Sequence, residues 1–412
     1  MVKTASGVRT AWLAWTCAVA VSIALIALTH YTTRDPDSLL HADIAARLSR
    51  QPVDRWIAPE WWGLWGMHGL YGEHPAGIFL APAALARLGF PAEQSAYAMN
   101  VVYQAASLIL AVLVARALVD PVEARALGWL LQLLPIAFVF RIRANHEYAL
   151  LAGLLLAVYS TERARRRPGW TLGMMAGFCV VLLVKGVFAV TVPIACAVWL
   201  VARSGQPGGL RVGWPAWTAV ALMPVVAVVG AWGYDAAYVR VTGQSFLEIY
   251  RARQLPPGVL SGGAWWRRVP YTAVWYLARV VWYAFPWSLA AGWLAWRGTR
   301  NGAAWPWARR GRGAVDWIAS ADWQGAWFAL VSSLVMTAGF SLASRKADRY
   351  LFPVYFLVAA AGGVAALRRF GWLRRLAGRL DRPWVPAAFY LVLFLAALLT
   401  AGLLPTITFW RH

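Results

Sequence analysis

Long apolar runs separated by short basic stretches dominate this chain. Runs such as 97–118, 216–234 and 386–404 are long enough to cross a hydrocarbon core of ~30 Å as helices. Arginines gather between the apolar runs, in clusters at 163–167, 297–312 and 368–382. This alternation is the positive-inside pattern of a polytopic membrane protein. The pattern therefore predicts an all-α membrane bundle whose basic loops face the cytoplasm.

The number of crossings follows from keeping every basic loop on one side, which gives about 11 transmembrane helices. The expected spans are 10–29, 97–117, 125–142, 147–161, two helices within 169–202 that part near Lys185 and Gly186, 215–236, 273–296, 323–342, 350–367 and 384–405. Residues 30–96 then form a long extracytoplasmic first loop. We expect one integral membrane domain over 1–412, without a separate C-terminal soluble domain.

Two shorter apolar segments lie inside the first loop. Segment 76–88 is too short to cross and ends in Gly89-Phe90-Pro91, so we expect a helix at the outer interface. Segment 37–50 places Leu40, Ile44 and Leu48 on one face at helical spacing. It predicts a second interfacial helix in the same loop.

The composition supports a membrane protein and argues against nucleic acid binding. Of the 412 residues, 60% are hydrophobic and 14% charged, whereas soluble domains are about 45–50% apolar and about 25% charged. The net charge of +22 lies in the loop arginines, where contact with anionic lipid head groups is expected. Cys17, Cys179 and Cys196 lie in apolar runs without metal-ligand spacing, which disfavours a disulfide framework and a thiolate metal site.

Acid, base and anion-binding side chains collect on the predicted outer face. That face contains all six histidines. It also contains Asp35, Asp37, Asp43, Glu73, Glu147, Glu248, Arg143, Lys346 and Arg349. This is the arrangement expected where a phosphorylated, membrane-embedded substrate reacts. The simpler alternative, that loops hold whatever is polar, predicts no such sidedness for histidine.

Two local features are candidate chemistry in their own right. Asp35, Asp37 and Asp43 lie within nine residues just after the first apolar run, in a chain with only 17 acidic residues. A carboxylate at a membrane boundary is a functional candidate, although it can equally be the solvated start of an interfacial helix. Lys185 interrupts an apolar run. It is either a turn residue that reaches the interface or the partner of an anion.

Several short motifs, in order along the chain, resemble one family. They are Asp37-Ser-Leu-Leu-His41-Ala-Asp43-Ile44-Ala45, Glu73-His74-Pro75, Arg143-Ala-Asn-His-Glu147, Lys185-Gly186, Phe285-Pro286-Trp287 and Lys346-Ala-Asp-Arg349-Tyr350-Leu-Phe-Pro353. The chain resembles the polyprenyl-phosphate-dependent glycosyltransferases of the GT-C fold. The branch is the one shared by bacterial lipid A aminoarabinose transferases and dolichyl-phosphate-mannose protein mannosyltransferases.

The resemblance implies a GT-C-like bundle in the bacterial cytoplasmic membrane with its active site on the extracytoplasmic side. It implies inverting transfer of a sugar from a polyprenyl phosphate to a glycolipid, polysaccharide or protein acceptor. Asp37 aligns with the catalytic carboxylate that deprotonates the acceptor, with Asp35 as runner-up. Glu147 is expected to bind the sugar or to support the base.

The remaining motif residues are expected to bind substrate. Lys185, Lys346, Arg349 and Arg143 suit a departing phosphate, and His41 and Tyr350 belong to the same motifs. His74 and Glu73 suit the phosphate or a divalent ion, since a pair of this kind does not assign a metal. Trp61, Trp62, Trp65, Trp265 and Trp266 suit the rim of a prenyl groove or an ordinary aromatic belt.

Other classes of protein predict other patterns. An oligosaccharide ligase or polymerase that uses a diphosphate donor is the nearest rival among enzymes. A transporter would need an internal repeat and several polar residues deep in its spans, and the sequence offers few such residues and no repeat. A non-catalytic assembly subunit would not need acid and base on one face.

Overall fold

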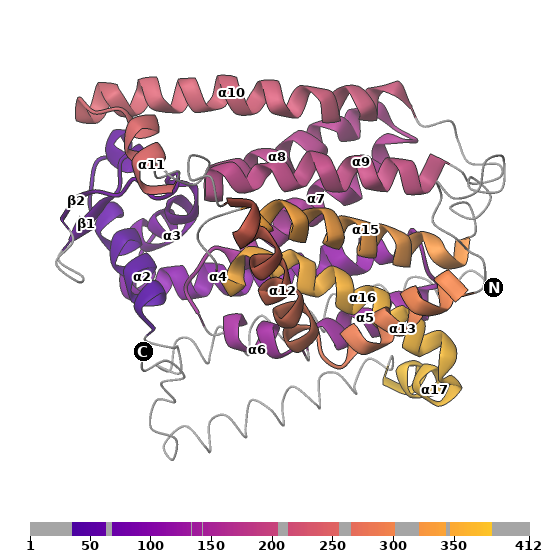
Figure 1. Ribbon diagram of the computed structural model, residues 1–412. Coiled ribbons are helices and arrows are strands. Elements are labelled where there is room, and N and C mark those ends of the chain that lie inside the picture. The colour runs from indigo at the N-terminus through magenta and orange to yellow at the C-terminus, as the bar shows by residue number, and fades with distance from the viewer. Residues whose placement is uncertain are drawn as a thin grey trace, which may run out of the picture.

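The computed structural model describes residues 35–62, 68–132, 134–141, 143–204, 213–254, 265–300, 321–342 and 347–380. Most of its long helices run side by side along one direction and form a bundle (Figure 1). The expected spans at 10–29 and 384–405 lie outside the described residues, as does Lys346. Apart from one short pair of strands, the described architecture is helical, in agreement with the sequence pattern.

One end of the bundle carries a small cap, drawn in indigo in Figure 1. The cap consists of α2 (Pro36–Leu48), the 3₁₀ helix η1 (Val53–Ile57), strands β1 (Glu60–Trp62) and β2 (His68–Leu70), and α3 (Gly77–Arg87). The two strands pair antiparallel, with Trp61 opposite Gly69. Helices α2 and α3 confirm the two short helices predicted in the first loop.

The bundle continues with α4 (Ala92–Ala115), α5 (Pro121–Gln132), α6 (Pro135–Arg141), α7 (Glu147–Ala164), η3 (Pro168–Trp170), α8 (Thr171–Lys185), η4 (Gly186–Val190) and α9 (Thr191–Ser204). It then comprises α10 (Trp214–Thr242), α11 (Phe246–Gln254), α12 (Trp265–Tyr283), α13 (Trp287–Arg300), α15 (Ala321–Ser341), η5 (Asp348–Leu351), α16 (Phe352–Arg369) and α17 (Gly371–Leu380). Helices α7 and α16 are buried along most of their length and form the core.

Four segments in the described part are long and apolar enough to cross a membrane: Ala92–Ala115, Pro168–Arg203, Trp214–Thr242 and Asp348–Arg369. The segment Pro168–Arg203 is itself two helices, because Gly186 adopts φ +51° directly after Lys185. The first turn of α8 and the last turn of α9 both lie beside the end of α7. Trp170 packs on Tyr159, and Arg203 binds Glu162 at 3.0 Å. Helices α8 and α9 are therefore antiparallel, which confirms the predicted turn at Lys185.

Two predicted single helices are wrong. The expected span 125–142 is α5 followed by α6, bent by 61°, and the expected helix 273–296 is α12 followed by α13. A proline lies at each break, Pro135 and Pro286. Proline lacks the donor that continues a helix and disfavours helical geometry at the residue before it.

A close approach of two helices fixes the core next to the cap. A Cβ built on Gly177 of α8 would lie 2.5 Å from the carbonyl oxygen of Gly153 on α7. Only glycine allows backbones to come this near, as in the small-residue interfaces of membrane helices. The contact holds α8 against α7 and so places Lys185 beside the first turn of α7.

Helix α17 lies at the opposite end of the bundle from the cap (Figure 1). The sequence predicts only a basic loop there. Arg374 of α17 binds Asp120 at 2.7 Å, and Arg368 of α16 binds Glu123 at 3.1 Å. These ion pairs join the basic segment around Arg368 and Arg374 to the start of α5.

Candidate active site

The N-terminus of α2 is tied to the loop before α7. Asp35 caps α2 by accepting hydrogen bonds from the Ser38 amide (3.3 Å) and hydroxyl (2.5 Å). The Ser38 hydroxyl accepts in turn from the Ala144 amide at 3.1 Å. Arg143 Nε lies 3.6 Å from Asp35 Oδ2. Through this network Asp35 serves as the N-cap residue of α2. The same network holds the next carboxylate, Asp37, where the cap meets the bundle.

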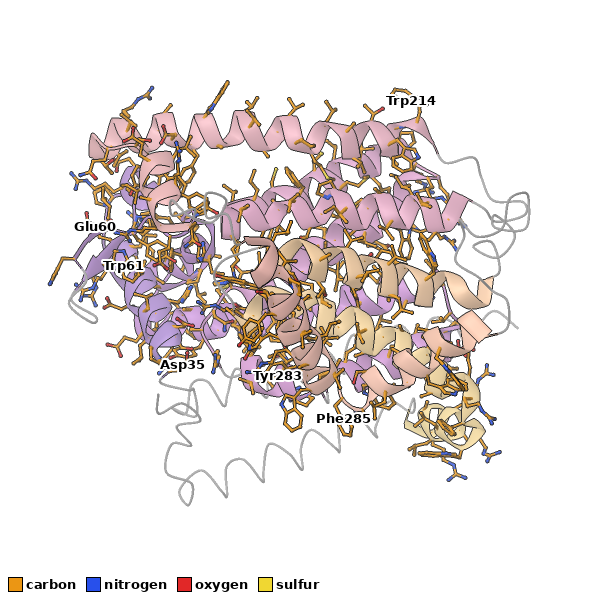
Figure 2. The ribbon with its side chains drawn as sticks, viewed as in Figure 1. Asp35, Glu60, Trp61, Trp214, Tyr283 and Phe285 are labelled. Carbon is orange, nitrogen blue, oxygen red and sulfur yellow. The ribbon has the colours of Figure 1, made fainter. Side chains whose placement is uncertain are left out.

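Asp37 forms an ion pair with Arg349, which lies on the 3₁₀ helix η5 directly before α16. The two side chains are 37% and 32% exposed, so the pair remains accessible to solvent or a ligand. Figure 2 labels Asp35, which precedes Asp37 by two positions in the sequence, and Trp61 in the cap, with Trp214 at the far end of α10.

The neighbour of Arg349 holds η5 in place. Asp348 Oδ1 lies 3.1 Å from Arg279 Nε, and Asp348 Oδ2 accepts a hydrogen bond of 2.9 Å from the Tyr283 hydroxyl. The Tyr355 hydroxyl donates to the Asp348 carbonyl at 2.7 Å. Two hydrogen bonds and one ion pair, from α12 and α16, therefore orient the turn that carries Arg349. Figure 2 marks Tyr283 on α12.

Beneath the ion pair lies a buried polar cluster. His41, His146, Glu147 and Lys185 are each at most 5% exposed. Lys185 Nζ lies 2.5 Å from His146 Nε2 and 3.9 Å from Glu147 Oε1. His146 Nε2 lies 3.1 Å from the same Glu147 oxygen. Within the described residues neither carboxylate oxygen of Glu147 has a hydrogen bond.

Burial sets the protonation of the histidines in this cluster. Desolvation lowers the pKa of His41, lowers that of His146 to about 3, and lowers that of His74 well below its ordinary value. All three rings are therefore neutral at pH 7.

Aromatic rings complete the walls of the cluster. The Lys185 ammonium lies 5.0 Å from the centre of the Tyr350 ring, within the range of a cation–π interaction. The His74 and His146 rings are 5.4 Å apart, and Glu73 precedes His74 in the loop before α3. Arg143 stacks on Phe140 at 4.9 Å.

The structure thus brings together most of the residues that the sequence singled out. Asp35, Asp37, His41, His74, Arg143, Glu147, Lys185, Arg349 and Tyr350 meet where the cap joins the bundle. Asp43 instead pairs with Arg47 one turn on in α2, at 2.9 Å.

The rim of tryptophans is only partly tested. The prediction is wrong for Trp61, which is 2% exposed and packs on Tyr71. The side chains of Trp62, Trp65, Trp265 and Trp266 lie outside the described part. In that part, no three His, Cys, Asp or Glu side chains are grouped so as to hold a metal ion.

Sequence reasoning missed His146 and Asp348 as site residues. Each adjoins a motif residue, Glu147 or Arg349, and that adjacency was the available signal. Their roles depend on partners in distant segments, Lys185 on α8 and Tyr283 on α12, which local patterns do not reveal.

Comparisons with known proteins agree with this picture. Residues 73–232 match the sequence profile of the dolichyl-phosphate-mannose-protein mannosyltransferase family. A crystal structure of ArnT from Cupriavidus metallidurans bound to undecaprenyl phosphate superposes with a TM-score of 0.56 and 19% identity, over 96% of this chain and 72% of that one. The apo structure of the same protein gives a TM-score of 0.53 and 18% identity, over 96% and 71%. Curated protein sequences give no match. These comparisons confirm the GT-C fold and the resemblance to polyprenyl-phosphate-dependent glycosyltransferases.

Proposed function

We propose that this protein is a membrane glycosyltransferase that moves a sugar from a polyprenyl-phosphate donor to an acceptor at the cap end of the bundle. The family match and the shared fold support the class of enzyme. The observation that carries the residue assignment is the accessible ion pair of Asp37 and Arg349. It places a carboxylate and a guanidinium together above a buried lysine.

The donor phosphate binds the cationic side of the site. The neighbouring fold with undecaprenyl phosphate supports a lipid phosphate as the ligand here. Arg349 offers a planar fork of donors that matches a phosphate, and Lys185 adds a second positive charge behind it. Arg143 lies farther out, beside Asp35. Lys346 remains a candidate from the sequence motif.

The reaction is a single inverting displacement. The acceptor oxygen or nitrogen attacks the anomeric carbon, the bond from that carbon to the phosphate oxygen breaks, and the electron pair leaves with the polyprenyl phosphate. Asp37 takes the acceptor proton. Because the donor phosphate and Asp37 compete for Arg349, donor binding releases the Asp37 carboxylate for this role. Arg349 and Lys185 stabilise the charge that develops on the phosphate.

Glu147 binds the sugar in this scheme. It is fully buried beside Lys185, and both of its oxygens lack hydrogen bonds within the described residues. Hydroxyl or amino groups of a sugar can supply the missing donors. A carboxylate satisfied in this way orients the anomeric carbon without taking part in proton transfer.

The site lies on the extracytoplasmic side of a bacterial cytoplasmic membrane in this proposal, within one integral domain. The support is the charge distribution, because Arg368, Arg374 and the loop arginines 163–167 lie at the end of the bundle opposite the cap. The positive-inside rule places that end in the cytoplasm. The acceptor is then a glycolipid, polysaccharide or protein outside the cytoplasm.

Release of polyprenyl phosphate tests the proposal. Purified protein in nanodiscs is supplied with a panel of polyprenyl-phosphate sugars and candidate acceptors, wild type beside Asp37→Asn. The matched control is Asp54→Asn, an exposed carboxylate of η1 in the same cap. We expect turnover of one donor, lost in Asp37→Asn and kept in Asp54→Asn. Full activity of Asp37→Asn would remove it as the base, and absence of both turnover and donor binding would favour transport or assembly.

A further inference from the structure

His146 contacts both His41 of α2 and Lys185 of α8, one through each of its ring nitrogens. Its Nδ1 lies 3.5 Å from His41 Nε2, and its Nε2 lies 2.5 Å from Lys185 Nζ. His41 continues the chain, because its Nδ1 lies 2.7 Å from the carbonyl oxygen of Asp37. A line of hydrogen bonds therefore runs from the ammonium on α8 to the backbone of the proposed base on α2.

The chemistry of the groups fixes where each proton lies. A carbonyl oxygen only accepts, so His41 must carry its proton on Nδ1. A neutral His41 then has a lone pair on Nε2, and His146 can bind it only by donating from Nδ1. A neutral His146 is left with a lone pair on Nε2, which accepts from the Lys185 ammonium. The direction of each hydrogen bond in this series follows from the first one, which His41 donates to the Asp37 carbonyl oxygen.

The position of Glu147 is consistent with this assignment. Its Oε1 lies 3.1 Å from His146 Nε2, yet the two do not form a hydrogen bond in the described structure. The 3.1 Å contact therefore does not itself require a proton on Nε2. The Lys185 ammonium, 3.9 Å from the same oxygen, supplies the positive charge that this arrangement requires.

We propose that His146 is a positioning residue that holds the Lys185 ammonium against the donor phosphate and couples it, through His41, to the backbone of Asp37. This inference rests on the proposed glycosyltransferase function. The long lysine side chain would otherwise sample several rotamers. The Nε2 acceptor, the Glu147 carboxylate and the Tyr350 ring hold it in one place. In this proposal, neither the His41 ring nor the His146 ring touches the reacting atoms.

The proton assignment is testable without activity. Full-length protein in nanodiscs is labelled with ¹⁵N-histidine, and the His41 and His146 signals are identified by their loss in His41→Asn and His146→Gln. We expect both rings to be neutral and protonated on Nδ1 at pH 7. A His146 signal that is cationic or protonated on Nε2 would overturn the inference, because that ring would donate to Glu147 instead of accepting from Lys185.

Binding and kinetics test the coupling. His146→Leu removes the acceptor for Lys185, so undecaprenyl phosphate should bind about tenfold more weakly, the effect of losing one hydrogen bond to a charged group. The donor kcat/KM should fall as well, while the acceptor KM stays unchanged. His146→Gln keeps an oxygen acceptor near the same place and should restore much of the binding. The control is His68→Gln, an exposed histidine of β2.

The outcomes separate the two proposals. If wild type transfers sugar but His146→Leu and His146→Gln bind undecaprenyl phosphate as wild type does, the positioning role is wrong and the function stands. If wild type transfers no sugar, the proposed function fails. The labelled histidines then still report whether the chain of hydrogen bonds exists.

Discussion

Asp37 and Arg349 are 312 positions apart in the sequence and form an ion pair where the cap meets the core of the bundle. Under the proposed function, Arg349 has two competing anions, the Asp37 carboxylate and the donor phosphate. An ion pair that is about one third exposed contributes little to folding by itself. In the proposed mechanism, the pair brings the base and the phosphate-binding group into one place.

The first prediction concerns this arginine. Arg349→Gln should lower the donor kcat/KM by roughly 10- to 100-fold, because a charge-assisted hydrogen bond is worth about 1.5–3 kcal/mol. Arg349→Lys should be intermediate, since lysine keeps the charge but loses the planar fork. The measurement is the initial rate of polyprenyl phosphate release. Arg47→Gln, which removes a surface arginine of α2 that pairs with Asp43, is the control and should retain wild-type rates.

The second prediction concerns the support of Arg349. Tyr283→Phe removes the hydrogen bond to Asp348 Oδ2 and should lower the donor kcat/KM about three- to tenfold, in line with the loss of one ordinary hydrogen bond. Asp348→Ala also loses Arg279 and should lower it further. Tyr159→Phe, whose ring packs on Trp170 at the other end of α7, serves as the control. Equal rates for Tyr283→Phe and wild type would show that η5 needs no such support.

The sequence predicted the elements better than their contacts. The turn at Lys185 was visible because a lysine and a glycine interrupt an apolar run, and α2 showed its apolar face at Leu40 and Ile44. The breaks at Pro135 and Pro286 were missed because the apolar pattern continues across them, and hydropathy does not register a missing hydrogen-bond donor. Helix α17 was missed because its arginines resemble a loop.

The candidate site was predictable only at residues that lie in short local motifs. Asp37, Glu147 and Arg349 lie on the predicted outer face, and the family resemblance suggests their roles through local motifs. The contact of His146 with Lys185 joins the first turn of α7 to the last turn of α8, and it depends on the close packing of Gly153 and Gly177. Helix packing of this kind leaves no short motif, so only the folded structure reveals it.

The third prediction concerns that packing. A methyl group on Gly177 would meet the Gly153 carbonyl oxygen at 2.5 Å, so Gly177→Ala must push α8 away from α7. Overpacking of this kind costs about 1–3 kcal/mol, and we expect a lower midpoint of thermal unfolding in detergent. Gly233→Ala on α10 is the control, since its added Cβ meets no atom within 4 Å. Equal midpoints for the two variants would contradict the close approach.

The fourth prediction concerns pH and the buried histidines. Burial lowers the pKa of His41, His74 and His146 in the folded protein, whereas an unfolded histidine titrates near 6.5. Below about pH 6.5 the unfolded state therefore binds protons that the folded state does not, and the stability falls as the pH falls toward the folded-state values. Above about pH 7 both states are neutral, and these groups no longer affect the stability.

Thermal unfolding of the protein in detergent, followed from pH 8 to pH 5, should show a plateau and then a decline that steepens below the unfolded pKa. His74→Phe should make the decline shallower, because it removes one of the three buried rings, while His68→Gln, at an exposed position, should leave it unchanged. A midpoint that stays constant down to pH 5 would mean that the three rings take up protons as readily in the fold as in the unfolded chain.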